Sequence, residues 1–277
     1  MDLPPQSSDR YRSRYTEIPQ QRQPPSPIKS IFAPIIAAIV GFFKYGVGLL
    51  KFAPFLKTGL TMLISMGAYT LLYGWKFAVG FVLLIFVHES GHLVAARMCG
   101  LKVGAPVFIP FLGASIALKE APKNAWIEAI IGYGGPLFGT LGGLGAMAIG
   151  VATANPLFYA LAQTTFFLQI FNMVPIIPLD GGRVVSAISP WLWIVGLLIL
   201  VPFLIATLSG PGVYILILVA TSLPRVWRSF KNRKNPAMSR YFECQPWQRV
   251  VTAVAYFGLL CFLAAAFIGT QVLMTAV

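Results

Sequence analysis

Long apolar stretches, separated by short polar connections, make up most of the sequence after residue 30. Only 10% of the residues are charged, whereas a soluble domain of this length carries about 25%. A protein with so few charges cannot face water over most of its surface. The sequence therefore predicts an all-α polytopic membrane protein with about six transmembrane helices.

One apolar stretch does not fit a transmembrane helix. Residues 103–118 contain Pro106 and Pro110, and Pro122 follows shortly after them. Proline lacks the backbone N–H that an α-helix needs and sterically clashes with the preceding turn. We therefore expect a short re-entrant or extended segment here.

Composition divides the chain into five segments. Residues 1–30 are rich in Pro, Ser, Gln and Arg and poor in apolar side chains, which is typical of disorder. Lys44, Lys51 and Lys57 lie on one stripe of the next stretch, and each would cost about 2.5–3.5 kcal/mol at the centre of a membrane span. The expected segments are a disordered cytoplasmic tail (1–30), an interfacial amphipathic helix (31–57), a membrane-embedded core (58–223), a basic cytoplasmic loop (224–249) and a C-terminal transmembrane helix (250–277).

The basic residues predict the orientation of the chain. They gather in the connections around residues 97–102, 119–123 and 225–249, whereas the connections around 152–156 and 209–212 carry no charge. The positive-inside rule then places the N-terminus in the cytoplasm. The basic loop could also indicate nucleic-acid binding. We favour contact with anionic lipid headgroups and no nucleic acid, because stacking aromatic residues do not alternate with the basic ones.

Ionisable residues inside the apolar stretches are rare and are gathered at two points. Glu89 and Asp180 are the only acidic residues embedded there, and the only two histidines of the chain, His88 and His92, lie beside Glu89. A buried, unpaired carboxylate costs about 2.5–3.5 kcal/mol in a membrane span. A divalent cation held between the two points would remove much of this cost.

The sequence His-Glu-Ser-Gly-His at residues 88–92 has the spacing of a metal site. His88 and His92 are four residues apart, hence on one face of a helix, and both imidazoles can reach one Zn²⁺. Glu89 lies close enough to act as a general base on a bound water. Zinc needs a third protein ligand, and Asp180 is the only other acid at comparable depth.

Structural explanations for the same residues also exist. Glu89 could pair with Arg97 or with a histidine, and Asp180 could pair with Arg183. Asn172 could form a polar contact between helices or donate to an oxyanion, and the residues alone leave both open.

The two motifs together resemble those of the site-2 protease family of intramembrane zinc metalloproteases. The resemblance rests on His-Glu-Ser-Gly-His at 88–92, on Asn-Met-Val-Pro-Ile-Ile-Pro-Leu-Asp-Gly-Gly at 172–182, and on the separation of eight between Asn172 and Asp180. It implies that His88, His92 and Asp180 bind the metal, Glu89 is the catalytic base, and Asn172 contacts the substrate or the transition state. The Gly-rich stretch 132–139 resembles the packing motif of the family, and 58–223 is then a metalloprotease core without PDZ or CBS domains.

This resemblance predicts a zinc metalloendopeptidase that cuts membrane proteins in or near their transmembrane segments, in a bacterial inner membrane. Because a helical substrate must unwind to be cut, we expect residues 103–118, with Phe108 and Ile116, to offer it a strand edge. The alternative is a metal or ion transporter that uses the same buried cluster, and a third possibility is a catalytically silent scaffold. Oligomeric state and substrate identity are left open by the sequence.

Overall fold

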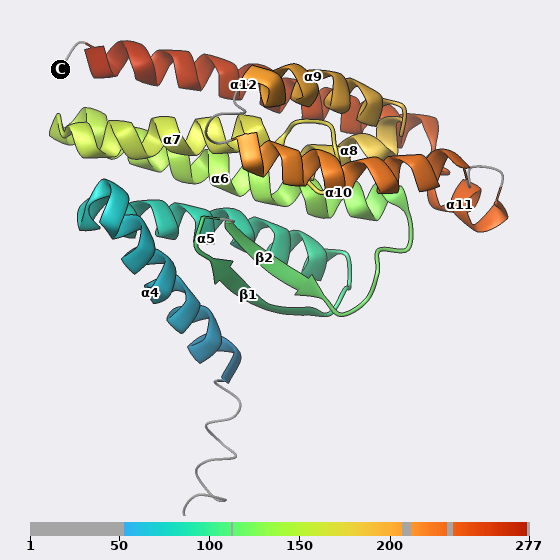
Figure 1. The fold of residues 1–277 in the computed structure, drawn as a ribbon, viewed down its shortest axis with the longest axis horizontal. Coiled ribbons are helices and arrows are strands. Elements are labelled where there is room, and N and C mark those ends of the chain that lie inside the picture. Colours follow the sequence, from blue (N-terminus) through green and yellow to red (C-terminus); the bar gives the residue numbers. More distant parts are fainter. Residues whose placement is uncertain (1–52, 112, 207–211, 232–234, 276–277) are drawn as a thin grey trace, which may run out of the picture. The chain divides into compact units, whose positions relative to one another are not determined.

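The computed structural model describes residues 53–111, 113–206, 212–231 and 235–275. The expected tail at 1–30 and most of the expected interfacial helix at 31–57 lie outside these residues. The described chain is mainly helical, as expected, and its single β-hairpin follows the helix that carries His88 and His92 (Figure 1). In chain order the elements are α4 (Ala53–Tyr73), α5 (Trp75–Met98), β1 (Val103–Ile109), β2 (Gly113–Leu118), α6 (Ala125–Thr153), α7 (Pro156–Asn172), α8 (Asp180–Ile188), α9 (Leu192–Ala206), α10 (Gly212–Lys231), α11 (Pro236–Tyr241) and α12 (Pro246–Thr275).

Local sequence signals explain where several helices begin and end. Gly74 has φ 80° and separates α4 from α5. The side chain of Asn124 accepts a hydrogen bond from the N–H of Ile127 and so caps α6. Asn155 caps α7 in the same way, and Pro156 occupies its first turn, where no N–H is needed.

Four of the described helices, α4, α5, α6 and α12, are long and apolar enough to cross a membrane. Large apolar side chains are exposed on their outer faces, as on α4, where Leu71 is 86% exposed. Water does not tolerate so much contiguous apolar surface, whereas lipid does. The chain is therefore an integral membrane protein.

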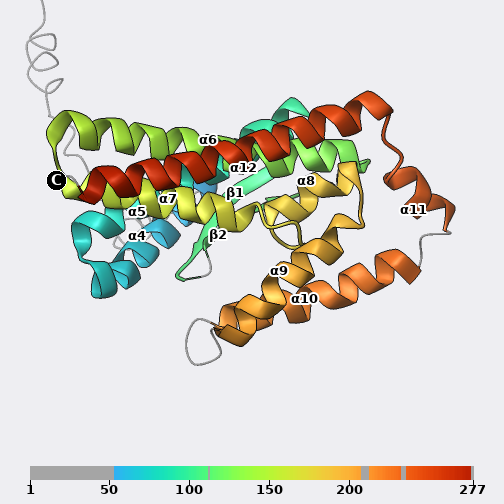
Figure 2. The ribbon, with the colours of Figure 1, turned by 90° about the horizontal axis from the view of Figure 1, so that it is seen from above.

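The site-bearing helices form the centre of the fold. α6 packs against α5, α7 and α8, and α12 packs along α7 and α8 although it comes last in the sequence (Figures 1 and 2). α9 packs against both α8 and α10 (Figure 2). A close approach brings α5 and α6 together, because a Cβ at Gly91 would lie 2.1 Å from the carbonyl oxygen of Gly134. Only glycines allow this contact, which sets the distance between the helix of the histidines and the helix behind it.

Several helices extend across the segment boundaries that composition suggests. The described part of α4 runs from Ala53 to Tyr73 and includes Lys57, so it extends across the expected boundary between residues 57 and 58. The expected loop at 224–249 is largely helical: α10 continues to Lys231, and α11 and the first turn of α12 follow.

The extended segment expected after α5 is an antiparallel hairpin of β1 and β2, in which Phe108 pairs with Ala114 and Pro106 with Ile116. The outer edge of β1 is covered by α4. Thr58 Oγ1 donates to the carbonyl of Pro106 at 2.6 Å, and Thr61 Oγ1 accepts from the N–H of Phe108 at 3.2 Å. No hydrogen bond within the described chain reaches the outer edge of β2.

Candidate metal centre

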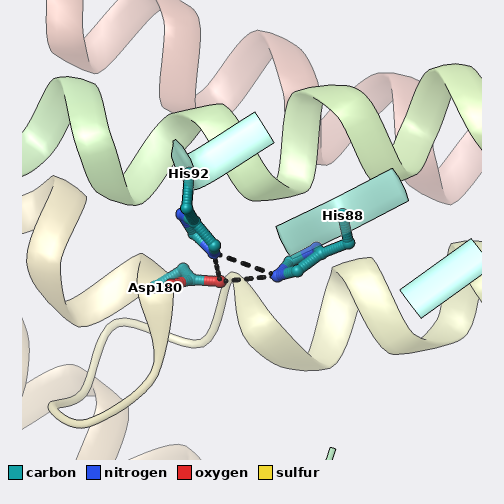
Figure 3. A group of neighbouring side chains, drawn as sticks. All are labelled: His88, His92 and Asp180. Carbon is teal, nitrogen blue, oxygen red and sulfur yellow. Dashed lines mark hydrogen bonds and ion pairs between the residues drawn. The ribbon is translucent and has the colours of Figure 1, made fainter. Parts of the chain in front are cut away.

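The two histidines lie on one face of α5, as the spacing predicts. Both are buried, and their rings meet edge to face with centroids 4.8 Å apart. Their Nε2 atoms are 3.1 Å apart. The pair thus directs two ring nitrogens toward one point beside α5 (Figure 3).

The other ring nitrogen of each histidine is held by a neighbouring helix. Nδ1 of His92 lies 2.7 Å from the carbonyl oxygen of Ile131 in α6. A carbonyl can only accept, so this Nδ1 carries the proton. Nδ1 of His88 lies 2.7 Å from Oε1 of Gln169 in α7 and donates to it in the same way. In neutral rings with these tautomers, both Nε2 atoms present lone pairs to each other.

Space for the ring of His92 is made by Gly135. A Cβ at this position of α6 would lie 2.1 Å from Nε2 of His92. Gly135 belongs to the Gly-rich stretch 132–139, which resembles the packing motif of the site-2 protease family. The stretch therefore serves the site directly, in addition to bringing the helices together.

Asp180, the third residue of the centre, lies at the start of α8, far from the histidines in sequence. α7 ends at Asn172, and Pro175 and Pro178 prevent its continuation, so that the chain turns and begins α8 at Asp180. The turn is tight: a Cβ at Gly181 would lie 2.2 Å from the carbonyl oxygen of Met173. This turn places the carboxylate against the histidines.

The two oxygens of the Asp180 carboxylate have different neighbours. Oδ2 lies 3.2 Å from Nε2 of His88 and 3.2 Å from Nε2 of His92, as the dashed triangle in Figure 3 shows. Oδ1 lies 3.7 Å from Nη1 of Arg183. The ion pair with Arg183 that the sequence leaves possible therefore exists, and it leaves Oδ2 with the histidines.

The three converging atoms fit a metal ion. Two lone-pair nitrogens from buried histidines and one oxygen of the partly buried Asp180 carboxylate lie within 4.8 Å of one another and repel unless a cation lies between them. A tetrahedral ion with ligands at about 2.0–2.1 Å sets them about 3.3 Å apart, close to the distances observed. Two imidazoles and one carboxylate are also a ligand set typical of a catalytic zinc site, which keeps its fourth position open.

Glu89 lies beside this point without belonging to it. Its side chain is buried, within electrostatic range of both histidines, of Asp180 and of Arg183. Within the described chain its carboxylate forms no ion pair and no hydrogen bond, and the possible pair with Arg97 is not formed. A buried carboxylate without a partner is available to accept a proton.

The remaining predicted residues lie farther along the chain. Asn172 is half-buried at the last turn of α7, one turn beyond Gln169. Phe108 is 3% exposed and packs in a cluster with residues of α4 and α5, whereas Ile116 of β2 is half-buried. The structure thus brings together His88, His92 and Asp180 with Glu89 beside them, and it buries the side chain of Phe108.

Gln169 is the site residue that sequence reasoning missed. It is fully buried, and its Nε2 has no hydrogen-bond partner among the described residues. A signal was present, since a glutamine inside an apolar helix is costly unless it serves a partner. That partner is His88, 81 positions away in the sequence.

Fold and site together define a membrane-embedded protein with a buried centre of two histidines and an aspartate. Residues 76–155 match the model of peptidase family M50. This match confirms the resemblance to the site-2 protease family that the motifs indicate, and it includes α5 with its histidines and α6 behind them.

Three relatives of similar sequence are named zinc metalloproteases. The chain is 32% identical over 119 residues to "Zinc metalloprotease MJ0392" of Methanocaldococcus jannaschii, covering 40% of this chain and 34% of the relative. It is 32% identical over 141 residues to "Putative zinc metalloprotease Rip3" of Mycobacterium tuberculosis, covering 47% and 35%. It is 27% identical over 123 residues to "Putative zinc metalloprotease sll0528" of Synechocystis, covering 41% and 32%. The chain thus spans about a third of the length of these curated relatives.

Proposed function

We propose that this protein is an intramembrane zinc metalloprotease that hydrolyses peptide bonds in or near the transmembrane segments of membrane proteins. One observation carries the proposal: two imidazole nitrogens and one carboxylate oxygen meet at 3.1–3.2 Å beside an unpaired, buried glutamate. The names of the relatives support zinc as the metal.

In this proposal His88, His92 and Asp180 hold the ion. When bound, zinc supplies Lewis acidity, which makes a water molecule nucleophilic near neutral pH and polarises the scissile carbonyl. The hydrogen bonds to Ile131 and Gln169 fix the two imidazoles so that Nε2 of each faces the ion. Arg183 holds the second oxygen of Asp180.

Glu89 is the general base. Its carboxylate accepts the proton of the attacking water and later passes it to the leaving amine. Asn172, one turn from Gln169, is positioned on the helix that faces the site and donates to the oxyanion of the tetrahedral intermediate or to the substrate backbone. Burial of Glu89 and of the two histidines limits the access of bulk water to the reaction.

Substrate binding is assigned to the hairpin. A helical substrate offers no free carbonyl, so the segment to be cut must unwind and find new hydrogen-bond partners. The outer edge of β2 supplies such partners, because α4 covers the edge of β1. Ile116 is therefore the better placed of the two residues expected to meet substrate, and Phe108 acts as a packing residue between the hairpin and α4.

The proposed membrane location and orientation of the chain rest on the distribution of its charged residues. The basic residues of 225–249 lie at the cytoplasmic surface near anionic headgroups, and the N-terminus is on the same side. The protein works in a bacterial inner membrane on membrane protein substrates and binds no nucleic acid. The transporter alternative has no observation in its favour, since Glu89 is held back from the metal-binding point rather than lining a second site.

The experiment compares the membrane proteome of cells that express the wild-type chain with that of cells expressing Glu89→Gln. The variant retains zinc and loses cleavage by roughly 10²–10⁴-fold, because a positioned base contributes about that much. Glu120→Gln changes an exposed carboxylate in the same way and serves as the control. Membrane proteins cut equally in the wild type and in Glu89→Gln would refute the proposal. A change in metal flux without any difference in cleavage would point to a transporter.

A further inference from the structure

A chain of charged and polar contacts leads from the metal-binding point to the far side of α6. Arg183 lies one turn after Asp180 on α8, and its Nε is 3.7 Å from Oε1 of Glu128, in the first turn of α6. The second oxygen of Glu128 accepts a hydrogen bond from the hydroxyl of Tyr241, at the end of α11. The contacts therefore run from Asp180 through Arg183 and Glu128 to Tyr241.

Arg183 is held between two carboxylates. Its guanidinium is 3.7 Å from Asp180 on one side and 3.7 Å from Glu128 on the other. A guanidinium and a single carboxylate close to about 2.7–2.9 Å and bind through two parallel hydrogen bonds when nothing opposes them. Neither pair reaches that geometry here: Nε faces Glu128 and Nη1 faces Asp180, so the guanidinium is shared between the two acids.

This balance matters for the metal ligand. If Arg183 moved fully onto Asp180, it would engage both carboxylate oxygens, and Oδ2 would leave the two imidazoles. Glu128 opposes that movement from the other side. Because both acids are partly buried, with side chains 12% and 23% exposed, water screens their attraction for Arg183 less than at an open surface.

Glu128 is itself held in place. Burial and the adjacent Glu128 carboxylate raise the pKa of Tyr241, so its phenol stays protonated and donates to Glu128. Tyr241 meets the ring of Phe242 edge to face, and Phe242 meets Trp193 in the same way. Trp193 Nε1 donates to the carbonyl of Gly182 at 2.8 Å, which fixes the start of α8 by a second route.

We propose that Glu128 and Tyr241 are positioning residues of the metal centre: they restrain Arg183 so that Asp180 keeps one oxygen for the ion. The inference rests on the proposed function only in that the centre binds zinc. It assigns a role to α11, which contacts neither histidine, and it makes the fit of α11 against α6 a determinant of metal affinity.

The test is the zinc affinity of the purified full-length chain, measured in detergent by competition with a chromophoric chelator. Glu128→Gln removes the charge that opposes Arg183 and is expected to weaken zinc binding about 10–100-fold, the usual effect of losing an outer partner of a metal ligand. Tyr241→Phe should weaken it less, in the same direction. Arg183→Gln removes the competitor, so adding Glu128→Gln to it should cause little further loss.

Two comparisons separate positioning from general support of the fold. Glu120→Gln breaks the exposed pair between Lys102 and Glu120, which has the same 3.7 Å separation, and should leave zinc affinity unchanged. With Co²⁺ as probe, Glu128→Gln should shift the visible absorption bands, because the carboxylate ligand has moved. A loss of folding stability alone would leave the bands of the loaded protein where they are.

The inference is overturned if Glu128→Gln and Tyr241→Phe bind zinc as the wild type does, or if Glu128→Gln costs as much affinity without Arg183 as with it. Should Glu128→Gln not yield folded protein, Tyr241→Phe decides alone, since it removes a single hydroxyl. A wild-type chain that binds no zinc overturns the proposed function and this inference together. If the wild type binds zinc and the variants bind it equally tightly, only the inference is overturned.

Discussion

The hydrogen bond between Gln169 and His88 offers the sharpest test of how the metal centre is built. Gln169→Leu keeps the size of the side chain and removes the acceptor 2.7 Å from Nδ1 of His88. The Nδ1–H is then buried without a partner, because both residues are almost fully enclosed. The imidazole can recover a partner only by turning, and turning moves Nε2 away from the other two ligand atoms.

The magnitude follows from that lost partner. Leaving a buried donor unsatisfied costs about 1–3 kcal/mol, which corresponds to roughly 5–150-fold in an equilibrium constant. Outer partners of metal-binding histidines change metal affinity by about 10–100-fold, in the same range. We therefore expect Gln169→Leu to weaken zinc binding by one to two orders of magnitude. Gln169→Glu keeps an acceptor facing Nδ1 and should retain more affinity than Gln169→Leu.

The assay is again chelator competition on the purified chain, with thermal unfolding of the metal-free protein measured beside it. The matched control is Gln163→Leu, on the same helix, where the glutamine lines a shallow hollow between α7 and α12 and contacts neither histidine. It should leave zinc affinity unchanged. If Gln169→Leu binds zinc as tightly as the wild type, the tautomer argument for the two histidines is wrong.

Two further predictions concern the packing around the site and the hairpin. Gly135→Ala should abolish zinc binding, because the new Cβ would lie 2.1 Å from Nε2 of His92. The control is Gly145→Ala on the same helix, whose Cβ would have nothing within 4 Å and which should bind zinc normally. Equal binding by both variants would refute the role given to Gly135. A photo-crosslinking residue at position 116 should capture a membrane protein substrate in the Glu89→Gln background, and one at the buried position 108 should do so far less. Efficient capture from position 108 with none from 116 would show that substrate does not use the β2 edge.

Much of the site was readable from sequence because it depends on local periodicity. Four-residue spacing puts His88 and His92 on one helical face whatever surrounds them. The rarity of acids in the apolar stretches singled out Asp180 as the third group, since a buried charge in a membrane needs a partner. The prolines after α5 likewise excluded a helix at 103–118, where the structure has the hairpin.

Contacts between distant segments were decided only by the tertiary structure. The partners that fix the histidines, Gln169 and the Ile131 carbonyl, come from two other helices, and nothing in a local pattern says which turn of one helix faces which turn of another. The sequence offered Arg183 as an alternative partner for Asp180, and the fold lets both interactions coexist by giving each carboxylate oxygen its own neighbour.

The same holds for the hairpin and the outer network. That α4 covers β1 and leaves the edge of β2 depends on two threonines that no motif marks. Tyr241 and Glu128 are 113 positions apart and meet only because α11 folds back onto the start of α6. The sequence by itself determined the class of chemistry, through spacing and the cost of buried charge. The tertiary structure decided which groups orient that chemistry, because orientation depends on how helices pack.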